Sequence, residues 1–316
     1  EALDTQLALG VLFRRRGEID RAIRLHQNLL ERPASSTSQR EDASFALAED
    51  YLSAGLFDRA EELLVRLRNS RVHGANALRR LLRICEVTSD WDRAVDLCAD
   101  LNRLAPGAAT PAQMAHYYCE LAEQARKARS VDAARELLAQ AEAIEPGKTR
   151  TTLIRADLDV DAGRSVDAVD ALLHLGLSQP SALDEVAPRL LALASTADGR
   201  NAVGAALREL AAAPAGLRAI ALAVIRDPTV DDPLVLEHLA AFVAQQPLLN
   251  VLSGTERGWT TPEGVVRLRP VLHRLLAREG RFQCGNCGYM SAVRHWQCPG
   301  CRSWDTTQQV NSELLA

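Results

Sequence analysis

Four cysteines near the C-terminal end of the chain have a spacing that points to one chemistry. Cys284, Cys287, Cys298 and Cys301 form a C-x2-C-x10-C-x2-C pattern. Two thiolates separated by two residues can reach one ion from a single tight turn, and two such turns supply the tetrahedral sulfur shell that suits zinc or a single iron. Residues that allow a sharp bend accompany both turns: Gly285, Gly288, Pro299 and Gly300. The pattern therefore predicts one metal ion held by four cysteines.

Other roles for these cysteines fit the sequence less well. A disulfide framework is typical of small secreted domains, whereas this chain has 7 cysteines in 316 residues and no signal peptide. A redox C-x-x-C motif is normally single and lies beside a βαβ unit. Four thiolates leave no open coordination position, which favours a structural over a catalytic metal. His273 and His295 could each replace a cysteine as ligand, but exposed histidines are the favoured interpretation.

The composition excludes several classes of function. The chain is 47% hydrophobic and 4% aromatic, with a net charge of −4, so there is no electrostatic case for binding nucleic acid. It contains no uncharged apolar run of about 18 residues, as a membrane span would need. No Ser/His/Asp constellation, phosphate loop or H-E-x-x-H motif is present, so we predict no catalytic residue and no enzyme. Cys85, Cys98 and Cys119 lie in helical patterns and are expected to be buried as small hydrophobic residues.

An internal repeat organises the first 250 residues of the chain. The phrase Ile19-Asp20-Arg21-Ala22 recurs at Phe57 and at Trp91, and more loosely three more times. The anchoring alanines are Ala22, Ala60, Ala94, Ala134, Ala168 and Ala202, with separations of 38, 34, 40, 34 and 34 residues. A proline follows twelve residues after each of the last four anchors, at Pro106, Pro146, Pro180 and Pro214. A glycine precedes three anchors by five residues, at Gly17, Gly55 and Gly163.

This periodicity is typical of the tetratricopeptide repeat, a pair of antiparallel helices of about 34 residues. The glycine allows the turn inside a pair, the alanine lets the two helices cross closely, and the proline ends the second helix. Six phased anchors make an ordinary helical bundle the weaker interpretation. We expect an all-α superhelix whose groove binds partner proteins, although the sequence does not identify the partner-binding residues.

The predicted domain boundaries follow the decay of this repeat. We expect a repeat array of about seven repeats over residues 1–248, whose last, degenerate repeat includes a helix at Asp232–Gln246. A connecting loop and a basic helix from Pro262 to Arg278 occupy residues 249–280. The cysteine domain covers residues 281–308, and residues 309–316 form a tail. The basic helix carries Arg267, Arg269, His273, Arg274 and Arg278. A solvated helix face is favoured there over contact with nucleic acid, and an electrostatic role at a membrane surface or with an acidic partner is left open.

Helical repeats followed by cysteine knuckles resemble the lipopolysaccharide assembly protein B family of Gram-negative bacteria. The matching residues in the first repeats are Leu9-Gly10, Leu12-Phe13-Arg14, Arg16-Gly17-Glu18, Asp20-Arg21-Ala22-Ile23-Arg24, His26-Gln27, Ala54-Gly55-Leu56 and Asp58-Arg59-Ala60-Glu61. Further matches are His116, Tyr118-Cys119-Glu120-Leu121-Ala122, Cys284, Cys287-Gly288, Trp296, Cys298-Pro299, Cys301-Arg302 and Trp304. The resemblance covers nearly the whole chain and is strongest at both ends.

The resemblance implies a non-catalytic adaptor at the cytoplasmic side of the bacterial inner membrane. In the family, an N-terminal helix anchors the repeats, which pack against a C-terminal rubredoxin-like domain. The adaptor helps a membrane-bound ATP-dependent metalloprotease to degrade the deacetylase that commits precursor to lipid A, and an inner-membrane lipopolysaccharide sensor protein antagonises it. This chain starts at Glu1 without the anchor helix, so we expect it to be a soluble part of a longer protein.

Only the four cysteines carry over as site residues. The short x10 gap, and Arg302 where rubredoxins usually carry glycine, favour structural zinc over iron. The remaining alternatives are a rubredoxin-type electron-transfer protein and a generic repeat scaffold or co-chaperone. Phe282, Tyr289, Trp296 and Trp304 either dock the knuckles onto the last repeats or pack inside the small domain. The sequence leaves the oligomeric state open, with a homodimer as one option.

Overall fold

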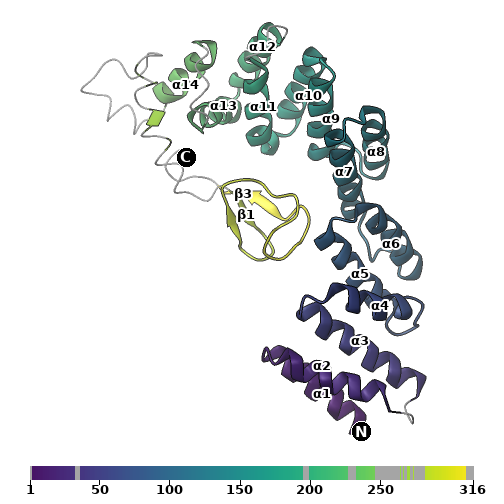
Figure 1. The fold of residues 1–316 in the computed structure, drawn as a ribbon. Coiled ribbons are helices and arrows are strands. Elements are labelled where there is room, and N and C mark those ends of the chain that lie inside the picture. The colour runs from purple at the N-terminus through teal and green to yellow at the C-terminus, as the bar shows by residue number, and fades with distance from the viewer. Residues whose placement is uncertain are drawn as a thin grey trace. The chain divides into compact units, whose positions relative to one another are not determined.

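The chain folds into helical pairs followed by a small three-stranded sheet. The computed structural model describes residues 2–32, 36–194, 199–226, 233–245 and 282–310, together with residues 264, 266, 269, 270 and 273. The helices of the first three pairs are α1 (Ala2–Arg15), α2 (Ile19–Leu30), α3 (Thr37–Ser53), α4 (Phe57–Leu67), α5 (Gly74–Thr88) and α6 (Trp91–Leu104). Those of the next two pairs are α7 (Pro111–Lys127), α8 (Val131–Ile144), α9 (Thr149–Asp161) and α10 (Ser165–Ser178). After the short 3-10 helix η1 (Pro180–Ala182) come α11 (Leu183–Ala194), α12 (Arg200–Ala211), α13 (Pro214–Arg226) and α14 (Pro233–Gln245) (Figure 1).

Three short strands complete the described fold. They are β1 (Phe282–Cys284), β2 (Met290–Ser291) and β3 (Thr307–Gln309). Strand β1 lies in the middle and pairs antiparallel with both neighbours, with Phe282 opposite Ser291 on β2 and Gln309 on β3. The predicted fold class, helical repeats with a small C-terminal domain, is confirmed by this order of elements.

The anchor position lies in the first turn of the second helices from α2 to α12 and is completely buried. Ala22, Ala60, Ala94, Ala134 and Ala168 are each the fourth residue of their helix, and each is completely buried. The sixth anchor, predicted at Ala202, is wrong by one residue. Helix α12 begins at Arg200, so its fourth residue is Val203, which is completely buried, while Ala202 is only partly buried. The buried anchors Ala168 and Val203 are 35 residues apart. Ala202 lies one position earlier, so the sequence suggests a separation of 34 residues.

The turns inside the helix pairs share one backbone geometry. Gly17, Gly55 and Gly163 have φ values of +80°, +73° and +75°, in the left-handed region that glycine adopts without strain. Ser89 and Arg129 occupy the equivalent turn position in the third and fourth pairs, with φ of +59° and +61°. In each turn the next residue donates its N–H to a carbonyl five positions back, as from Glu18 to Phe13 and from Ser130 to Ala125. The predicted role of the glycine is confirmed, and two of the turns within the described residues, at Ser89 and Arg129, lack a glycine.

The prolines lie beyond the second helices, as predicted. Pro106 and Pro146 each stand two residues after the last residue of α6 and α8. Pro180 opens the 3-10 helix η1, and Pro214 is the first residue of α13. Proline lacks the N–H that an interior helical position needs, but the first turn of a helix leaves that donor unused. The same residue type therefore ends one helix and, in two places, starts the next.

The chain divides into two compact units, Glu1–Leu121 and Ala122–Ala316. The first unit carries a buried polar cluster on its first three helices. Asp50 on α3 accepts a hydrogen bond from Nη1 of Arg14 at 2.6 Å, and its other oxygen lies 2.5 Å from Nδ1 of His26. Asp50 and His26 are completely buried. A Cβ at Gly10 would come within 2.2 Å of the His26 ring, so only glycine fits there. Gly10 and Arg14 of α1 and His26 of α2 therefore meet at one buried site.

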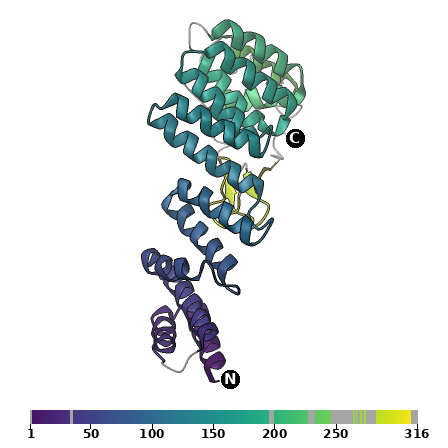
Figure 2. The ribbon, with the colours of Figure 1, turned by 90° about the vertical axis from the view of Figure 1, so that its right-hand side faces the viewer.

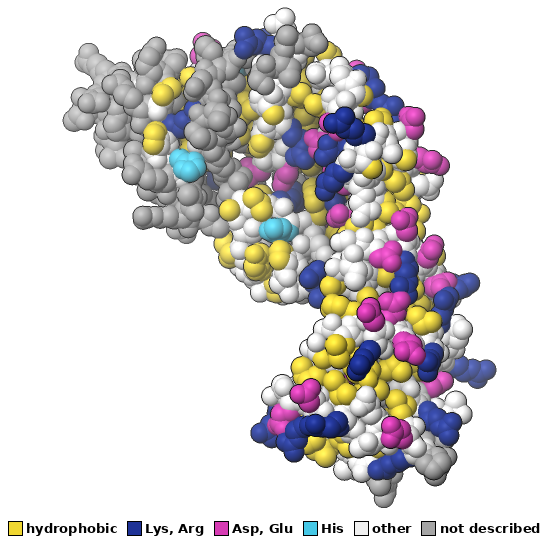
Figure 3. All heavy atoms as spheres, viewed as in Figure 1, with side chains coloured by type: hydrophobic (Ala, Val, Ile, Leu, Met, Phe, Trp, Pro, Cys, Tyr) yellow, Lys and Arg dark blue, Asp and Glu magenta, His cyan; other side chains and the backbone are white. Residues whose placement is uncertain are grey.

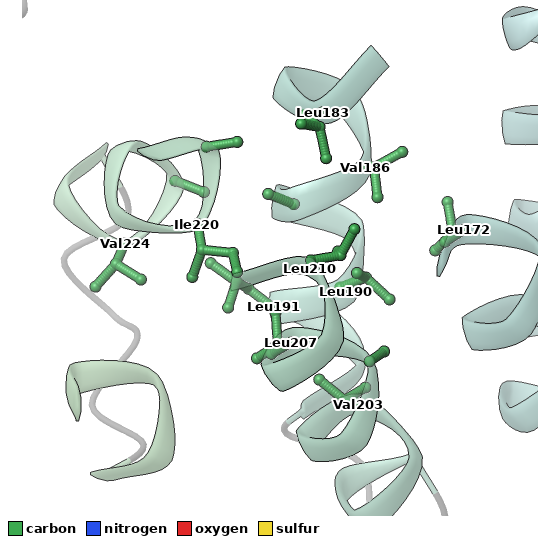
Figure 4. Close-up of a cluster of buried hydrophobic side chains, with 14 of the residues drawn as sticks. Leu172, Leu183, Val186, Leu190, Leu191, Val203, Leu207, Leu210, Ile220 and Val224 are labelled. Atoms are coloured by element: carbon green, nitrogen blue, oxygen red, sulfur yellow. The ribbon is translucent and has the colours of Figure 1, made fainter. Parts of the chain in front are cut away.

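The second unit contains a large apolar core built from α9 to α14. Figure 4 shows Leu190 and Leu191 of α11 beside Leu207 and Leu210 of α12, with Ile220 of α13 next to them. Helix α11 packs against α10, α12 and α13, and α13 packs against α14, so the helices of this unit lie side by side (Figure 2). Helix α14 matches the helix predicted at Asp232–Gln246. This core supports the face on which the small sheet domain lies.

The predicted basic helix lies mostly outside the described residues. Two of its basic side chains are described: His273 is exposed, as expected, whereas Arg269 is buried and donates its Nε–H to the carbonyl oxygen of Val224 at 2.9 Å. Arg269 is therefore part of the packing of the second unit, and the expected solvated face does not apply to it. Cys85, Cys98 and Cys119 are buried in the repeats, as predicted. Burial raises the pKa of the Cys85 thiol to about 11 and that of Cys98 to about 12, which makes them poor nucleophiles.

Candidate metal centre

Two knuckles of the same shape present the four cysteines. In the first, Gly288 donates its N–H to the carbonyl oxygen of Cys284 at 2.8 Å. In the second, Arg302 donates in the same way to Cys298, also at 2.8 Å. Both donors are in the left-handed region, Gly288 with φ of +75° and Arg302 with φ of +60°. Arg302, which replaces the glycine usual in rubredoxins, therefore occupies the left-handed position at which glycine would be least strained.

The four sulfur atoms form a compact group. All lie within 4.8 Å of one another, with 3.7 Å between the Sγ atoms of Cys284 and Cys301 and 3.6 Å between those of Cys287 and Cys298. Four sulfurs about 2.3 Å from one ion in a tetrahedron would be about 3.8 Å apart. A disulfide bond is about 2.05 Å long, so these pairs are thiols. The arrangement fits a single tetrahedral metal ion.

Local hydrogen bonds change the pKa values of the Cys284, Cys287 and Cys301 thiols by different amounts. The Ser303 hydroxyl and N–H lower the pKa of the Cys301 thiol to about 5, and the Thr306 hydroxyl lowers the pKa of Cys284. For Cys287, a bond from the Tyr289 backbone lowers the pKa, but desolvation and the three neighbouring sulfurs outweigh it and raise the pKa to about 12. Four negative sulfurs at these distances repel one another, so their full deprotonation requires a cation among them.

The histidines do not join the sulfur group. Among the described residues, the cluster of close metal-ligating atoms contains the four cysteines alone. His295 instead lies 3.0 Å from the Ser291 hydroxyl and meets the Tyr289 ring edge to face, with centroids 6.3 Å apart. The preference for cysteine over histidine ligands is thus consistent with the geometry.

Trp296 anchors the small domain to the repeats of the second unit. Its ring lies beneath two guanidinium groups, 5.8 Å from that of Arg150 on α9 and 5.1 Å from that of Arg294 in the small domain. It also packs against the apolar core of the repeats. Cation–π contacts of this kind strengthen when water is excluded. Trp296 is therefore the aromatic residue that faces the repeats.

Polar contacts also join the small domain to the repeats. Lys148 at the start of α9 pairs with Asp305, and Arg294 lies 3.4 Å from Glu185 on α11. Gln309 donates to the Asp184 carboxylate at 3.1 Å. Burial raises the pKa of the Glu185 carboxyl, an effect that Arg294 partly offsets. These contacts place the domain against α9 and α11, the first helices of the fifth and sixth pairs.

The other aromatic residues of the small domain have different positions. Phe282 is buried inside the domain, and Trp304 stands next to the sheet in an isolated bridge with Gln297. Tyr289 is 43% exposed, and Met290 and Val293 beside it are 45% and 57% exposed. Figure 3 shows hydrophobic side chains gathered on the outward face of this domain. Docking and internal packing were the two alternatives for these aromatic residues. Trp296 docks onto the repeats, whereas Phe282 packs inside the small domain.

Sequence reasoning missed the residues on the repeat side of this contact. Lys148, Arg150, Asp184 and Glu185 lie more than 100 positions before their partners in the small domain. Their types and spacing carry no signal, because ordinary repeat surfaces are equally rich in charge. Arg150 is buried despite its charge, but burial cannot be read from the repeat pattern.

Comparison with known proteins extends these observations. Residues 282–309 match a family described as the rubredoxin metal binding domain. Lipopolysaccharide assembly protein B of Escherichia coli strain K12 is 29% identical over 320 residues, covering 98% of this chain and 81% of that protein. Its counterpart from Haemophilus influenzae is 28% identical over 98% of this chain and 80% of that protein. The solved MamA AMB-1 structure covers 54% of this chain and 87% of its own, at 18% identity and a TM-score of 0.36. The chain therefore resembles lipopolysaccharide assembly protein B along nearly its whole length, in the repeats and in the rubredoxin-type metal-binding segment alike.

Proposed function

We propose that this protein is a non-catalytic adaptor in the regulation of lipopolysaccharide synthesis. The observation that carries the proposal is the alignment with lipopolysaccharide assembly protein B over 98% of the chain. An alignment of this extent includes both the repeats and the cysteine knuckles, a combination that a generic repeat scaffold or co-chaperone does not need. The proposal divides the chain into a repeat array over 1–248, a connector over 249–280 and a metal domain over 281–308.

In this proposal the adaptor promotes degradation of the deacetylase that commits precursor to lipid A. The protease is a membrane-bound ATP-dependent metalloprotease, and an inner-membrane lipopolysaccharide sensor protein opposes the adaptor. The site of action is the cytoplasmic side of the inner membrane. Within the described residues, no helix combines the length and the apolar character needed to cross a membrane. Attachment to the membrane is therefore assigned by similarity to the family and not by any described helix.

The proposal gives the cysteine cluster a structural role. Cys284, Cys287, Cys298 and Cys301 would hold one zinc ion, and a closed shell of four thiolates leaves no position for a substrate. The sulfur separations near 3.7 Å support this assignment. When bound, the metal would link the two knuckles to each other. The side chains of the domain supply the contacts to the repeats, through Trp296 and Arg294.

Metal analysis of the purified protein tests the structural role. We expect one zinc per chain and a colourless protein without a reduction wave. One iron per chain, with visible absorption and reversible reduction, would instead establish rubredoxin-type electron transfer. The protein should be purified without added metal, so that the content reflects what the cell supplied.

Turnover of the deacetylase tests the adaptor function. In the bacterium that carries this gene, its deletion should lengthen the half-life of the deacetylase, and re-expression should restore rapid turnover. The full-length protein should also co-purify with both the protease and the deacetylase. An unchanged half-life after deletion would refute the proposed function.

A further inference from the structure

A cleft lies beside the docked metal domain, next to the hydrogen bond between Gln309 and Asp184. Its volume is about 140 Å³. It is lined by Pro180, Leu183 and Asp184 near the start of α11, by Ala215, Arg218, Ala219 and Leu222 on α13, and by Gln309 of β3. The α13 residues are three or four positions apart and so form one face of that helix. The second unit therefore contains a cleft with walls from two helices and from the metal domain.

The floor of the cleft is apolar. Leu183, Ala219 and Leu222 belong to the core of the second unit and are each 4–5% exposed. An apolar space of about 150 Å³ can accept a group the size of benzene. One leucine-sized side chain would therefore fill this cleft.

Arg218 lines the cleft and has a side-chain donor without a hydrogen-bond acceptor among the described residues. The Nε of Arg218 is buried and has no hydrogen-bond partner among the described residues. The Asp184 carboxylate also lines the cleft, but it already accepts a hydrogen bond from Gln309 at 3.1 Å. A buried guanidinium donor without an acceptor is costly, and a carboxylate satisfies it best because two parallel hydrogen bonds can form. Charge complementarity therefore favours an acidic group at Arg218.

We propose that this cleft binds a short peptide segment of a partner protein in which an acidic residue stands next to a leucine. The carboxylate pairs with Arg218 and the leucine side chain contacts Leu183 and Leu222. Because Gln309 supplies one wall, the site is complete only when the metal domain is docked. This inference rests on the proposed adaptor function, since it names the chemistry by which the second unit would recognise a partner.

Fluorescence anisotropy with a labelled hexapeptide tests the proposal. The probe is Gly-Ser-Glu-Leu-Leu-Gly with blocked ends, titrated with the metal-loaded chain up to about 1 mM. We expect saturable binding that weakens about tenfold or more for the Arg218→Gln variant, because a charge-assisted hydrogen bond is lost. Arg208→Gln, a matched change at an exposed arginine on α12, should bind like the unaltered chain.

A change in the probe gives the same test without altering the protein. Replacing the probe's glutamate by glutamine should weaken binding as much as Arg218→Gln, and the two changes together should cost no more than either alone. Absence of saturable binding to the unaltered chain, or equal binding by Arg218→Gln, would overturn the proposal.

Two further results identify the occupant of the cleft and its role in the cell. A chain ending at Val310 that binds the probe more tightly than the full chain would identify the chain's own residues 311–316, which include Glu313 and Leu314, as the occupant in place of a partner. Normal deacetylase turnover supported by the Arg218→Gln variant would overturn a role for the cleft while leaving the adaptor function intact. Loss of the adaptor function itself is judged separately, from the gene deletion.

Discussion

The repeats and the metal domain reach a folded state by opposite means. In the repeats, each helix pair buries apolar side chains against its neighbours, and the core of the second unit runs from α9 to α14. In the metal domain, the described residues that expose less than one tenth of their surface are Phe282, Cys284, Cys298 and Thr307. Two of these four are metal-ligand candidates. A domain of this size cannot bury enough apolar surface to fold by itself, so the ion replaces the missing core.

The repeats and the metal domain also differ in how well they tolerate the loss of a single contact. A repeat array distributes its stability over many neighbouring contacts, so the loss of one contact weakens a stack without abolishing it. The metal domain concentrates its stability in four sulfur atoms and should therefore fail in one step. The predictions below use this contrast, beginning with the change of largest expected effect.

Loss of the metal should unfold the small domain and leave the repeats helical. Chelation removes the ion, and Cys298→Ser removes one of its four ligands; the binding free energy of structural zinc is on the order of 10 kcal/mol. Emission from Trp296 and Trp304 should shift to longer wavelength, while the far-ultraviolet circular dichroism of the helices changes little. Cys119→Ser, at an equally buried cysteine in the repeats, is the matched control and should keep its full metal content. Unchanged tryptophan emission after metal removal would contradict the prediction.

The first unit contains one place where a repeat should behave like the metal domain. Asp50→Ala leaves Arg14 and the buried His26 without their shared acceptor. Breaking a buried charge network of this kind costs about 3–5 kcal/mol. Urea unfolding followed by circular dichroism should show the loss. Asp58→Ala, at an exposed acid of α4, should change stability by no more than about 0.5 kcal/mol. Equal midpoints for the two variants would show that the cluster does not support the fold.

Trp296→Ala should release the metal domain from the repeats without unfolding it. The ring packs on the repeat core between Arg150 and Arg294, and a central tryptophan of an interface is typically worth about 2 kcal/mol or more. Hydrogen exchange should increase in the first turns of α9 and α11, while the metal content stays unchanged. Tyr289→Ala removes an aromatic ring that is 43% exposed and should leave the exchange as it was. Protection of α9 that survives the loss of Trp296 would show that the polar contacts are sufficient for docking.

These contacts show what the sequence could and could not predict. The cysteine quartet was readable because metal ligation demands fixed residue types at fixed short spacing, and the helix pairs were readable because their packing repeats. The anchor at Val203 was missed because a chance alanine at position 202 kept the apparent period at 34. The repeat residues that contact the metal domain were not predicted, because Arg150 and Glu185 are ordinary charged residues and only the three-dimensional fold brings them to Trp296 and Arg294.

Both regions share one backbone requirement, and it allows the smallest and most direct comparison. Arg129 in a repeat turn and Arg302 in the second knuckle have nearly the same left-handed conformation, with φ of +61° and +60°. Replacing either by glycine removes about 1–2 kcal/mol of strain and adds about 0.5–1 kcal/mol of chain entropy in the unfolded state, for a net gain of about 0.5–1 kcal/mol. Arg129→Gly should raise the urea midpoint of the repeats, whereas Arg302→Gly should tighten metal binding by about two- to fivefold.

The reverse changes test whether backbone strain is the cause of these gains. Gly163→Ala places a side chain at φ of +75° and should cost about 1 kcal/mol, although a Cβ there would meet no atom within 4 Å. Lys127→Gly removes a charged side chain near the Arg129 turn but from a helical position, so it should destabilise the repeats by about 0.5–1 kcal/mol. If Arg129→Gly and Lys127→Gly had the same sign, side-chain loss and not backbone conformation would be responsible. A gain at Arg302 but not at Arg129 would mean that the closed metal site stores strain that a repeat turn can relax, which would sharpen the contrast between the two regions.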